Sequence, residues 1–126
     1  MKYTILELSQ LIEEWLTKGK LNPDILADDF MFSSPFWKQA DKAEFLSKFL
    51  DPAEYIKKSL SNISNFDPVI CCFSEDKAYF TLALRYHTQN GYSVDEVVIC
   101  SVKSGLIHNM NTVYDLEQTK LAHNIV

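Results

Sequence analysis

Near the start of the chain, apolar residues recur at intervals of three and four positions. The recurring positions are Ile5, Leu8, Leu11, Ile12, Trp15 and Leu16. This period places them on one face of a helix. A T-x-x-E capping box precedes the face and Gly19 follows it, so residues 5–18 are predicted to be helical. A cap residue before a proline, Asn22 before Pro23, predicts a short second helix over residues 23–28.

The segment from Leu26 to Trp37 joins this helical half to the rest of the chain. An acidic pair is followed by phenylalanines two positions apart, which predicts a strand that ends at Pro35. Acidic cap residues then predict helices that begin after Asp41 and Asp51. We expect this segment to form one wall of a pocket between helices and sheet.

From Phe66 onward the pattern changes to period two, which is typical of strands. One face of segment 78–88 is apolar and comprises Ala78, Phe80, Leu82, Leu84 and Tyr86. Asn90 and Gly91 predict a hairpin turn, because both tolerate positive φ angles. Strands are expected at residues 69–73, 78–88, 92–102 and 106–114, with a loop at 61–65 and a terminal helical turn at 116–123.

The predicted order is helices, one strand, helices and then four strands joined mostly by hairpins. Such an order, in a chain of 126 residues, predicts one α+β domain with helices on one face of an antiparallel sheet. Long strands that bend around helices produce a cone with a mouth. We therefore expect a curved, cone-shaped sheet that wraps the N-terminal helices.

Composition narrows the class of partner. Apolar residues make up 47% and aromatic residues 13% of the chain, enough for a sizeable core. The net charge is −5 and no basic stripe is present, so neither nucleic acid nor an anionic membrane is an expected partner. No apolar run approaches the roughly 18 residues needed to span a bilayer, and the N-terminus does not resemble a signal peptide. We expect a cytoplasmic protein.

The cysteines and histidines lack the spacing of metal ligands. Cys71 and Cys72 are adjacent in a predicted strand, so one of them is expected in the core, and all three cysteines are expected to be reduced. Glycine occurs only at positions 19, 91 and 105, which leaves no phosphate-binding loop. We expect no metal and no cofactor.

Three parts of the sequence resemble the nuclear transport factor 2-like superfamily, and in particular its SnoaL-like branch of polyketide cyclases and ketosteroid isomerases. They are residues 27–35 with their Ala-Asp-Asp-Phe and Ser-Pro motifs, the helix start at 41–46, and residues 104–107 with 113–115. The resemblance implies one α+β barrel domain over residues 1–126, of the cystatin-like cone shape. It also implies a deep apolar pocket and a homodimer through the outer face of the sheet.

The sequence departs from the catalytic pattern of this branch. Enzymes related to ketosteroid isomerase carry an aspartate base directly before the proline that ends the first strand, and the matching residue here is Ser34. A neutral serine is a poor proton acceptor. The acid that these enzymes keep on a late strand falls within residues 96–98, where only Glu96 could serve. These departures argue against steroid isomerisation and leave other acid/base chemistry open.

Two residues are candidate catalytic groups. His108 shares a strand phase with Met110, Thr112 and Tyr114, and the superfamily pattern places that phase on the concave side. Its unperturbed pKa of about 6.5 suits proton transfer. Glu96 shares a phase with apolar residues, and if that phase faces inward its pKa should rise. The alternatives are a hydrogen-bonded structural histidine and a glutamate solvated at the rim.

The candidate ligand-binding residues lie on the same predicted wall and strands. They are Ser34, Phe36, Trp37, Tyr86, Cys100, Met110 and Tyr114. Tyr86 and Tyr114 could donate hydrogen bonds to a ligand carbonyl or be core rings with the hydroxyl at the rim. Phe36 and Trp37 follow a proline and are expected to form a lid.

Asp28 and Asp29 could be a pair of catalytic carboxylates or a solvated helix end. His87 is expected on the outer face of the sheet and His123 in the C-terminal tail.

Three functions remain open on the sequence alone. The leading one is binding of a small apolar or aromatic organic ligand in the pocket. The second is a cofactor-free isomerase, cyclase or dehydratase with Glu96 or His108 as base. The third is a homodimeric protein-interaction module whose outer sheet face carries the contact, through residues such as Tyr79, Val97 and Ile99.

Overall fold

The computed structural model describes residues 3–125, apart from the side chains of Pro52, Tyr55, Ile56 and Lys58. The helices are α1 (Ile5–Lys18), the short η1 (Pro23–Ile25), α2 (Lys42–Phe49), α3 (Pro52–Tyr55) continued by the π-helix η2 (Ile56–Leu60), and α4 (Leu116–Ala122). The strands are β1 (Leu26–Ser33), β2 (Ala40–Asp41), β3 (Ile63–Phe66), β4 (Ile70–Phe73), β5 (Tyr79–Thr88), β6 (Ser93–Lys103) and β7 (Leu106–Tyr114).

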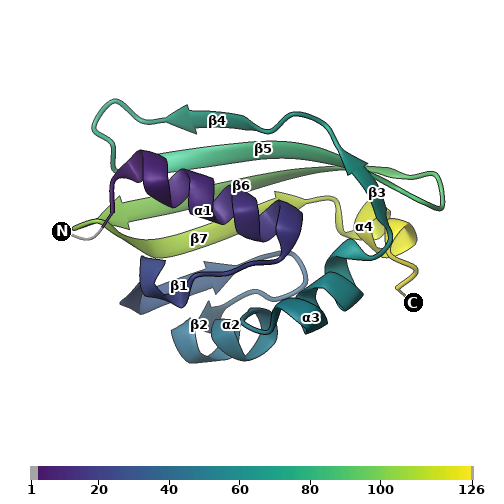
Figure 1. The fold of residues 1–126 in the computed structure, drawn as a ribbon, viewed down its shortest axis with the longest axis horizontal. Helices are drawn as coiled ribbons and strands as arrows, with labels where there is room; N and C mark the ends of the chain where they lie inside the picture. The colour runs from purple at the N-terminus through teal and green to yellow at the C-terminus, as the bar shows by residue number, and fades with distance from the viewer. Residues whose placement is uncertain (1–2, 126) are drawn as a thin grey trace.

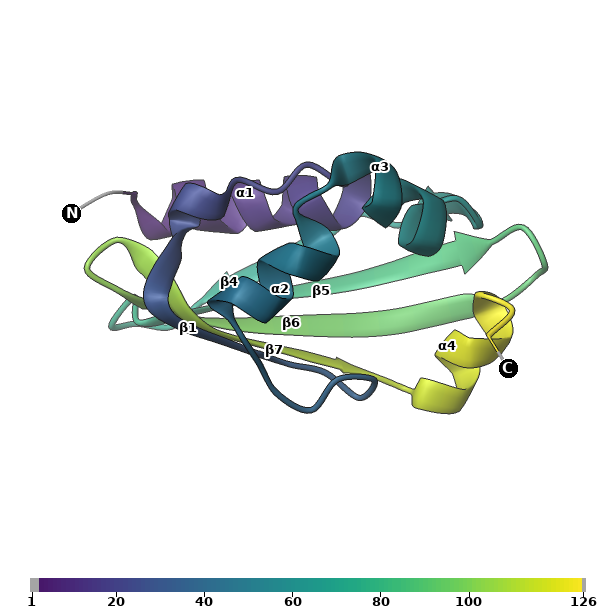
Figure 2. The ribbon, with the colours of Figure 1, turned by 90° about the horizontal axis from the view of Figure 1, so that it is seen from below.

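One curved sheet of seven strands carries the fold, in the order β2-β1-β7-β6-β5-β3, with β4 also paired to β5. All neighbours are antiparallel except β1 and β7, which are parallel. The sheet is not closed. Helices α1, α2 and α3 lie over its concave face, and α4 lies at the end of the long strands (Figures 1 and 2). This is the predicted α+β architecture.

Helix α1 matches its predicted bounds because both ends carry strong signals. Thr4 and Glu7 form a reciprocal capping box, and Gly19 ends the helix with a φ of 84°. The apolar face packs on the sheet, where Leu8 and Ile12 have no exposed surface. Helix α2 begins in the same way, with Asp41 as its cap residue.

A cluster of aromatic rings joins α1 and α2 to β1. Phe45 lies at its centre, with its ring centroid 5.4 Å from that of Trp15, 5.0 Å from Phe30, and 4.9 Å from both Phe32 and Phe49. Edge-on and tilted contacts of this kind are favourable beyond the area they bury. The cluster fixes the position of the helical layer above one half of the sheet.

Two boundary predictions are wrong because strand pairing overrides local signals. The second helix ends at Ile25 rather than residue 28, since Leu26 enters β1 and pairs with Ile107 of β7. The loop expected at 61–65 contains the start of β3, whose residue Phe66 pairs with Tyr86 of β5. Both segments form strands by pairing with a neighbouring strand, β7 in the first case and β5 in the second.

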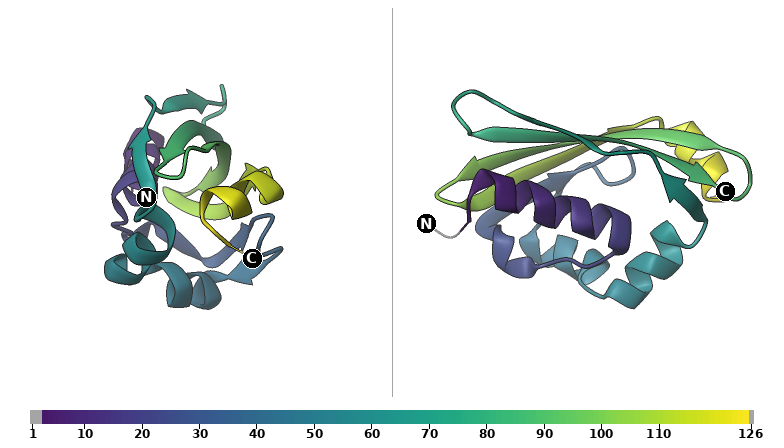
Figure 3. Two further views of the ribbon diagram at one scale, coloured as in Figure 1. Left: turned by 90° about the vertical axis from the view of Figure 1, so that its right-hand side faces the viewer. Right: turned by 45° about the horizontal axis from the view of Figure 1, so that its top comes forward.

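The prediction that Cys71 or Cys72 lies in the core is also wrong, because both are exposed. They lie on β4, which pairs only with β5 among the strands of residues 3–125, and all four residues of β4 are exposed. Figure 3 shows β4 at the outer margin of the sheet. An edge strand lacks the neighbour that would bury its inward side chains.

A bulge breaks the alternation of β7 near its start. Ser101 pairs with Asn109 and the next residue, Val102, pairs with Ile107, so His108 is an extra residue in β7. The register of β1 against β7 shifts at the same place, between Leu26 and Met31. The alternation of inward-facing and outward-facing side chains along β7 is therefore interrupted at the bulge.

Candidate ligand site

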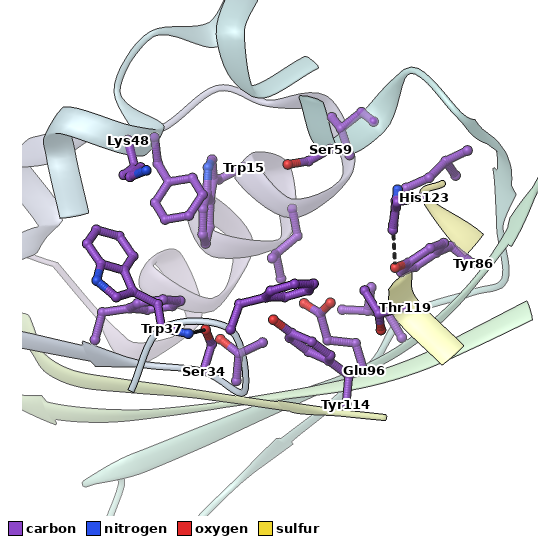
Figure 4. Close-up of a pocket in the computed structure, with 18 of the residues that line it drawn as sticks. Trp15, Ser34, Trp37, Lys48, Ser59, Tyr86, Glu96, Tyr114, Thr119 and His123 are labelled. Carbon is purple, nitrogen blue, oxygen red and sulfur yellow. Dashed lines mark hydrogen bonds between the residues drawn. The ribbon is translucent and has the colours of Figure 1, made fainter. Parts of the chain in front are cut away.

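A cavity of about 440 Å³ lies between the concave face of the sheet and the helices. Its floor comes from β5, β6 and β7 and its roof from α1, α2 and η2, while the loop 34–37 and α4 close its sides (Figure 4). The residues that line it include Trp15, Phe32, Ser34, Phe36, Trp37, Lys48, Phe66, Tyr86, Glu96, Thr112, Tyr114, Thr119 and His123. Most of this surface is aromatic or aliphatic.

Glu96 provides a carboxyl group on the floor of this cavity. It lies on β6 between Leu84 of β5 and Tyr114 of β7, and its side chain points into the cavity beside Tyr114 and Thr119 (Figure 4). Within residues 3–125, no hydrogen bond or ion pair is present at its carboxylate. Burial raises the pKa of Glu96 to about 7. Of the two alternatives that the sequence left open for Glu96, the structure has the one in which its side chain faces the cavity.

Tyr86 and His123 form a hydrogen-bonded pair at the other end of the floor. The Tyr86 hydroxyl lies 2.8 Å from Nε2 of His123, and the two rings are 5.5 Å apart. Burial raises the pKa of Tyr86 and the Glu96 carboxylate raises it further, while burial lowers the pKa of His123. Both partners are therefore neutral near pH 7.

Tyr114 provides a second phenol beside Glu96. Burial raises its pKa, and the Glu96 carboxylate acts in the same direction, whereas Ser34 opposes the shift. The Phe36 ring lies 6.0 Å from the Tyr114 ring. Glu96 thus has a phenol close by on each neighbouring strand of the sheet.

The loop 34–37 forms the wall that the sequence predicted. Ser34 and Trp37 exchange backbone hydrogen bonds of 2.9 and 3.2 Å, and Ser34 Oγ also accepts from the Trp37 amide at 3.0 Å. Trp37 packs against Phe32, with centroids 6.2 Å apart, and Lys48 Nζ lies 5.7 Å from the Trp37 ring centroid. Phe36 is 46% exposed at the edge of the cavity.

The structure brings six of the nine predicted site residues to the cavity. They are Ser34, Phe36, Trp37, Tyr86, Glu96 and Tyr114. Cys100 and Met110 do not line it. They have the predicted inward phase, but the helices cover their part of the sheet and leave them 0% and 1% exposed in the core.

His108 does not reach the cavity, so its predicted position there is wrong. The bulge at residue 108 removes it from the phase of Met110 and Tyr114. Its Nδ1 instead lies 2.7 Å from Oδ1 of Asp29 on β1. Asp28 faces Lys42, whose Nζ is 3.7 Å from Oδ1, so the two aspartates are not a catalytic pair.

Sequence reasoning missed the contribution of the C-terminal helix. Thr119 and His123 line the cavity, and Thr119 Oγ1 is buried without a hydrogen-bond partner. The Asp115 cap was a visible signal for the helix, but its docking depends on distant partners. Asn90 Nδ2 donates to the Leu121 carbonyl at 3.1 Å, and no sequence pattern indicates that contact.

Neither a metal-ligand cluster nor a membrane-spanning helix is found in the described part of the chain. No three His, Cys, Asp or Glu residues among 3–125 are grouped so that they could hold a metal ion. In the same range, every helix is too short or too polar to cross a bilayer. The cavity lining presents carboxyl, phenol, imidazole, hydroxyl and ammonium groups.

Solved structures resemble this one along nearly the whole chain. A proposed isomerase from Bacillus subtilis is 15% identical with a TM-score of 0.65, over 95% of this chain and 96% of that one. A protein of ketosteroid isomerase-like fold from Catenulispora acidiphila, solved with trimethylamine, is 11% identical with a TM-score of 0.62, over 95% and 94%. A proposed polyketide cyclase from Pseudomonas putida is 17% identical with a TM-score of 0.62, over 91% and 94%.

No protein-family model matches the chain, and no curated protein sequence matches it. Structural similarity at such low sequence identity shows that the folds are alike and does not show that the activities are. Further similar structures are described as NTF2-like proteins, from Cytophaga hutchinsonii and Burkholderia xenovorans. The chain has the nuclear transport factor 2-like fold, in the form shared with ketosteroid isomerase-like proteins and polyketide cyclases.

Proposed function

We propose that this protein binds a small, largely apolar organic molecule in the cavity, with one polar group of the ligand directed at Glu96. The cavity volume of about 440 Å³ is within the range of small-molecule sites, which is roughly 300–1,000 Å³. Such sites combine an apolar lining with a few placed polar groups. The aromatic lining and the Glu96, Tyr86 and Tyr114 side chains fit that description.

The observation that carries this proposal is the unpartnered Glu96 carboxyl. Burying a carboxyl group without a hydrogen-bond partner destabilises a protein. The core positions around it, such as Val98, are filled by apolar side chains of similar size. A ligand that hydrogen-bonds to Glu96 would offset this cost, which supports a binding role for the position.

Ligand binding can be followed through the two tryptophans of the chain, because both Trp15 and Trp37 line the cavity. We expect 2-indanol, a rigid bicyclic alcohol, to change their fluorescence in a saturable way. Thr112→Phe should abolish the change because Thr112 lines the cavity floor. Asn111→Phe, on the next residue and the exposed face of β7, should leave it intact.

Two results would contradict the binding proposal. One is a fluorescence signal that changes neither with 2-indanol nor with 2-aminoindane, the amine of the same bicyclic body, up to their solubility limits. The other is a change of equal size in the Thr112→Phe and Asn111→Phe variants, which would place the alcohol outside the cavity. Circular dichroism of both variants checks that each is folded.

A cofactor-free isomerase, cyclase or dehydratase is the second candidate function. The observation in its favour is the Glu96 carboxyl in the cavity lining, opposite Tyr114 on the next strand. Burial raises its pKa to about 7, and a general base is most effective when its pKa is close to the working pH. Tyr86 or Tyr114 would then donate a hydrogen bond to a developing oxyanion. The structural likeness to proteins described as a proposed isomerase and a proposed polyketide cyclase adds support to this class.

Proton exchange tests the catalytic candidate without knowledge of the substrate. We expect the protein to accelerate exchange of the α-protons of 2-indanone with deuterated water, measured by proton NMR. Glu96→Gln should return the rate to that of buffer, and Glu75→Gln, in an exposed turn, should not. Equal rates with and without the wild-type protein would count against catalysis and leave the binding proposal in place.

A second copy of the chain is the proposed partner, through the outer face of the sheet. Exposed and half-buried apolar residues form this face, namely Ile70, Tyr79, Val97, Ile99 and Val113. Neighbouring strands bring Ile70, Ala83, Val97 and Val113 into one row across the sheet. A continuous apolar row that pairs with its own copy would bury all of these residues at once.

We also infer a reducing, cytoplasmic location. Cys71 and Cys72 are exposed and unpaired, and exposed thiols persist where the surroundings keep them reduced. Fractionation of the source cells with an antibody against the chain checks this location.

A further inference from the structure

We propose that the ligand of the cavity is an organic cation, a protonated amine on a compact apolar body, whose ammonium group pairs with Glu96. This inference rests on the binding function proposed above and adds the charge of the ligand. It depends on the charges around Glu96, on the rings beside it and on the hydroxyl groups of the cavity wall.

The first argument concerns charge. Lys48 is the one Lys or Arg among the described residues that line the cavity, and its Nζ lies over the Trp37 ring rather than at Glu96. The other described Lys and Arg residues do not line the cavity, and Arg85 pairs with Asp95 on the outer face. The Glu96 carboxylate is therefore a negative charge without a positive partner in the part of the chain that the structure describes.

The second argument concerns the rings. Tyr114 with Phe36, and Tyr86 with Phe66, are ring pairs with centroids 6.0 Å apart, and all four residues line the cavity. Aromatic rings attract a desolvated ammonium group, so a carboxylate enclosed by rings is well suited to an amine. An anionic ligand would meet both the Glu96 carboxylate and the negative ring faces.

The third argument concerns hydrogen bonds. An ammonium group donates several hydrogen bonds and needs acceptors. Glu96 supplies carboxylate oxygens, and Thr119, whose buried Oγ1 has no hydrogen-bond partner among the described residues, lies beside it (Figure 4). The apolar remainder of the cavity would hold the body of the amine.

A neutral carbonyl ligand is the competing class, because a protonated Glu96 could donate a hydrogen bond to it. The two classes require opposite protonation states of Glu96. The titratable groups that line the cavity together with Glu96 are Tyr114 on β7, Tyr86 on β5, His123 at the C-terminal cap of α4 and Lys48 on α2. The raised pKa values of the phenols and the lowered pKa of His123 keep those three neutral above about pH 6.5.

Binding of a matched pair of probes, 2-aminoindane and 2-indanol, tests the inference. They share one rigid body, and an aliphatic amine stays protonated through pH 8, as the lysine ammonium does with its pKa of about 10.4. We expect the amine to bind more tightly than the alcohol at pH 8. Its affinity should rise about tenfold from pH 6 to pH 8, as Glu96 ionises around pH 7.

Variants assign this effect to Glu96. In Glu96→Gln the amine should bind no more tightly than the alcohol, and its pH dependence should disappear. Glu75→Gln, which removes the same charge from an exposed turn, should keep both properties. This comparison excludes a general attraction between the amine and the net charge of −5.

The outcomes separate the inference from the function on which it rests. Saturable binding of both probes with equal affinity, and no change between pH 6 and pH 8, would overturn the organic cation and leave the cavity as a site for neutral molecules. Tighter binding of the alcohol at pH 6 would assign the site to neutral acceptors. Failure of both probes to bind the wild-type protein would overturn the proposed binding function as well.

Discussion

The Tyr86 hydroxyl lies 2.8 Å from Nε2 of His123, and this contact ties the C-terminal helix to the floor of the cavity. Further hydrogen bonds support the same docking. Asn62 Nδ2 donates to the Ala122 carbonyl, and Gln118 Nε2 donates to the Ser93 carbonyl at 3.1 Å. Helix α4, which closes one end of the cavity, is therefore held to the sheet and to the loops beside it by several polar contacts.

Tyr86→Phe should loosen α4 while the rest of the sheet stays intact. The substitution removes a part-buried hydrogen bond, which costs about 1 kcal/mol of unfolding free energy. Amide hydrogen exchange should become faster in Leu116–Ala122 and remain unchanged in β6. Tyr79→Phe, on the exposed side of β5, is the matched control, and equal exchange in both variants would contradict the docking role.

Glu96 makes the stability of the protein depend on pH. The pKa of the Glu96 carboxyl is 4.5 in the unfolded chain, the ordinary value for glutamate, and about 7 in the folded chain. Between these values the unfolded chain has released a proton that the folded chain retains, so the unfolding free energy falls as pH rises and levels off above pH 7. Glu96→Gln should equal the wild type near pH 4.5 and exceed it by about 3 kcal/mol at pH 8, by urea unfolding.

A constant difference between Glu96→Gln and the wild type from pH 4.5 to pH 8 would show that Glu96 titrates normally. Glu75→Gln serves as the control for loss of an exposed charge. Its unfolding free energy should follow that of the wild type at every pH.

His108→Gln should leave ligand binding unchanged. His108 interacts with Asp29 rather than with the cavity, and the Asp29 side chain is 74% exposed. Exposed ion pairs contribute roughly 0–1 kcal/mol, so the loss of stability should be below about 1 kcal/mol. Titration of the variant with 2-indanol measures its affinity, and urea unfolding measures its stability. A large loss of affinity would return His108 to the site.

Val113→Lys should convert the proposed homodimer to a monomer. Val113 is 49% exposed and lies in the apolar row of the outer sheet face. A lysine there would be buried without a partner at a symmetric interface. Sedimentation velocity compares the variant with the wild type and with Leu6→Lys on α1, which should remain dimeric. A monomeric wild type would contradict the dimer.

The sequence predicted those parts of the fold whose signals are local. Capping residues and period three to four defined α1, and strict alternation gave the buried phase of β5, from Phe80 to Tyr86. The misses depend on neighbours that the sequence does not reveal. Leu26 enters a strand because β7 lies beside it. Cys71 is exposed because β4 pairs with no strand other than β5 among the strands of residues 3–125.

The site was predictable to the extent that it follows the strand phases. Glu96 and Tyr114 were placed correctly because β6 and β7 pair in register beyond the bulge. His108 was misplaced because a one-residue bulge has no sequence signature here. His123 was missed because its position depends on a tertiary contact with Tyr86.

Both proposed functions and the organic cation depend on Glu96 as a half-buried carboxyl group that faces the cavity. A carbon-13 NMR titration of its side-chain carboxyl group measures this property directly. We predict a midpoint at about pH 7 in the free protein and a lower midpoint when 2-aminoindane is bound. A midpoint near that of an ordinary glutamate, about 4.3, with no response to the amine, would contradict the account.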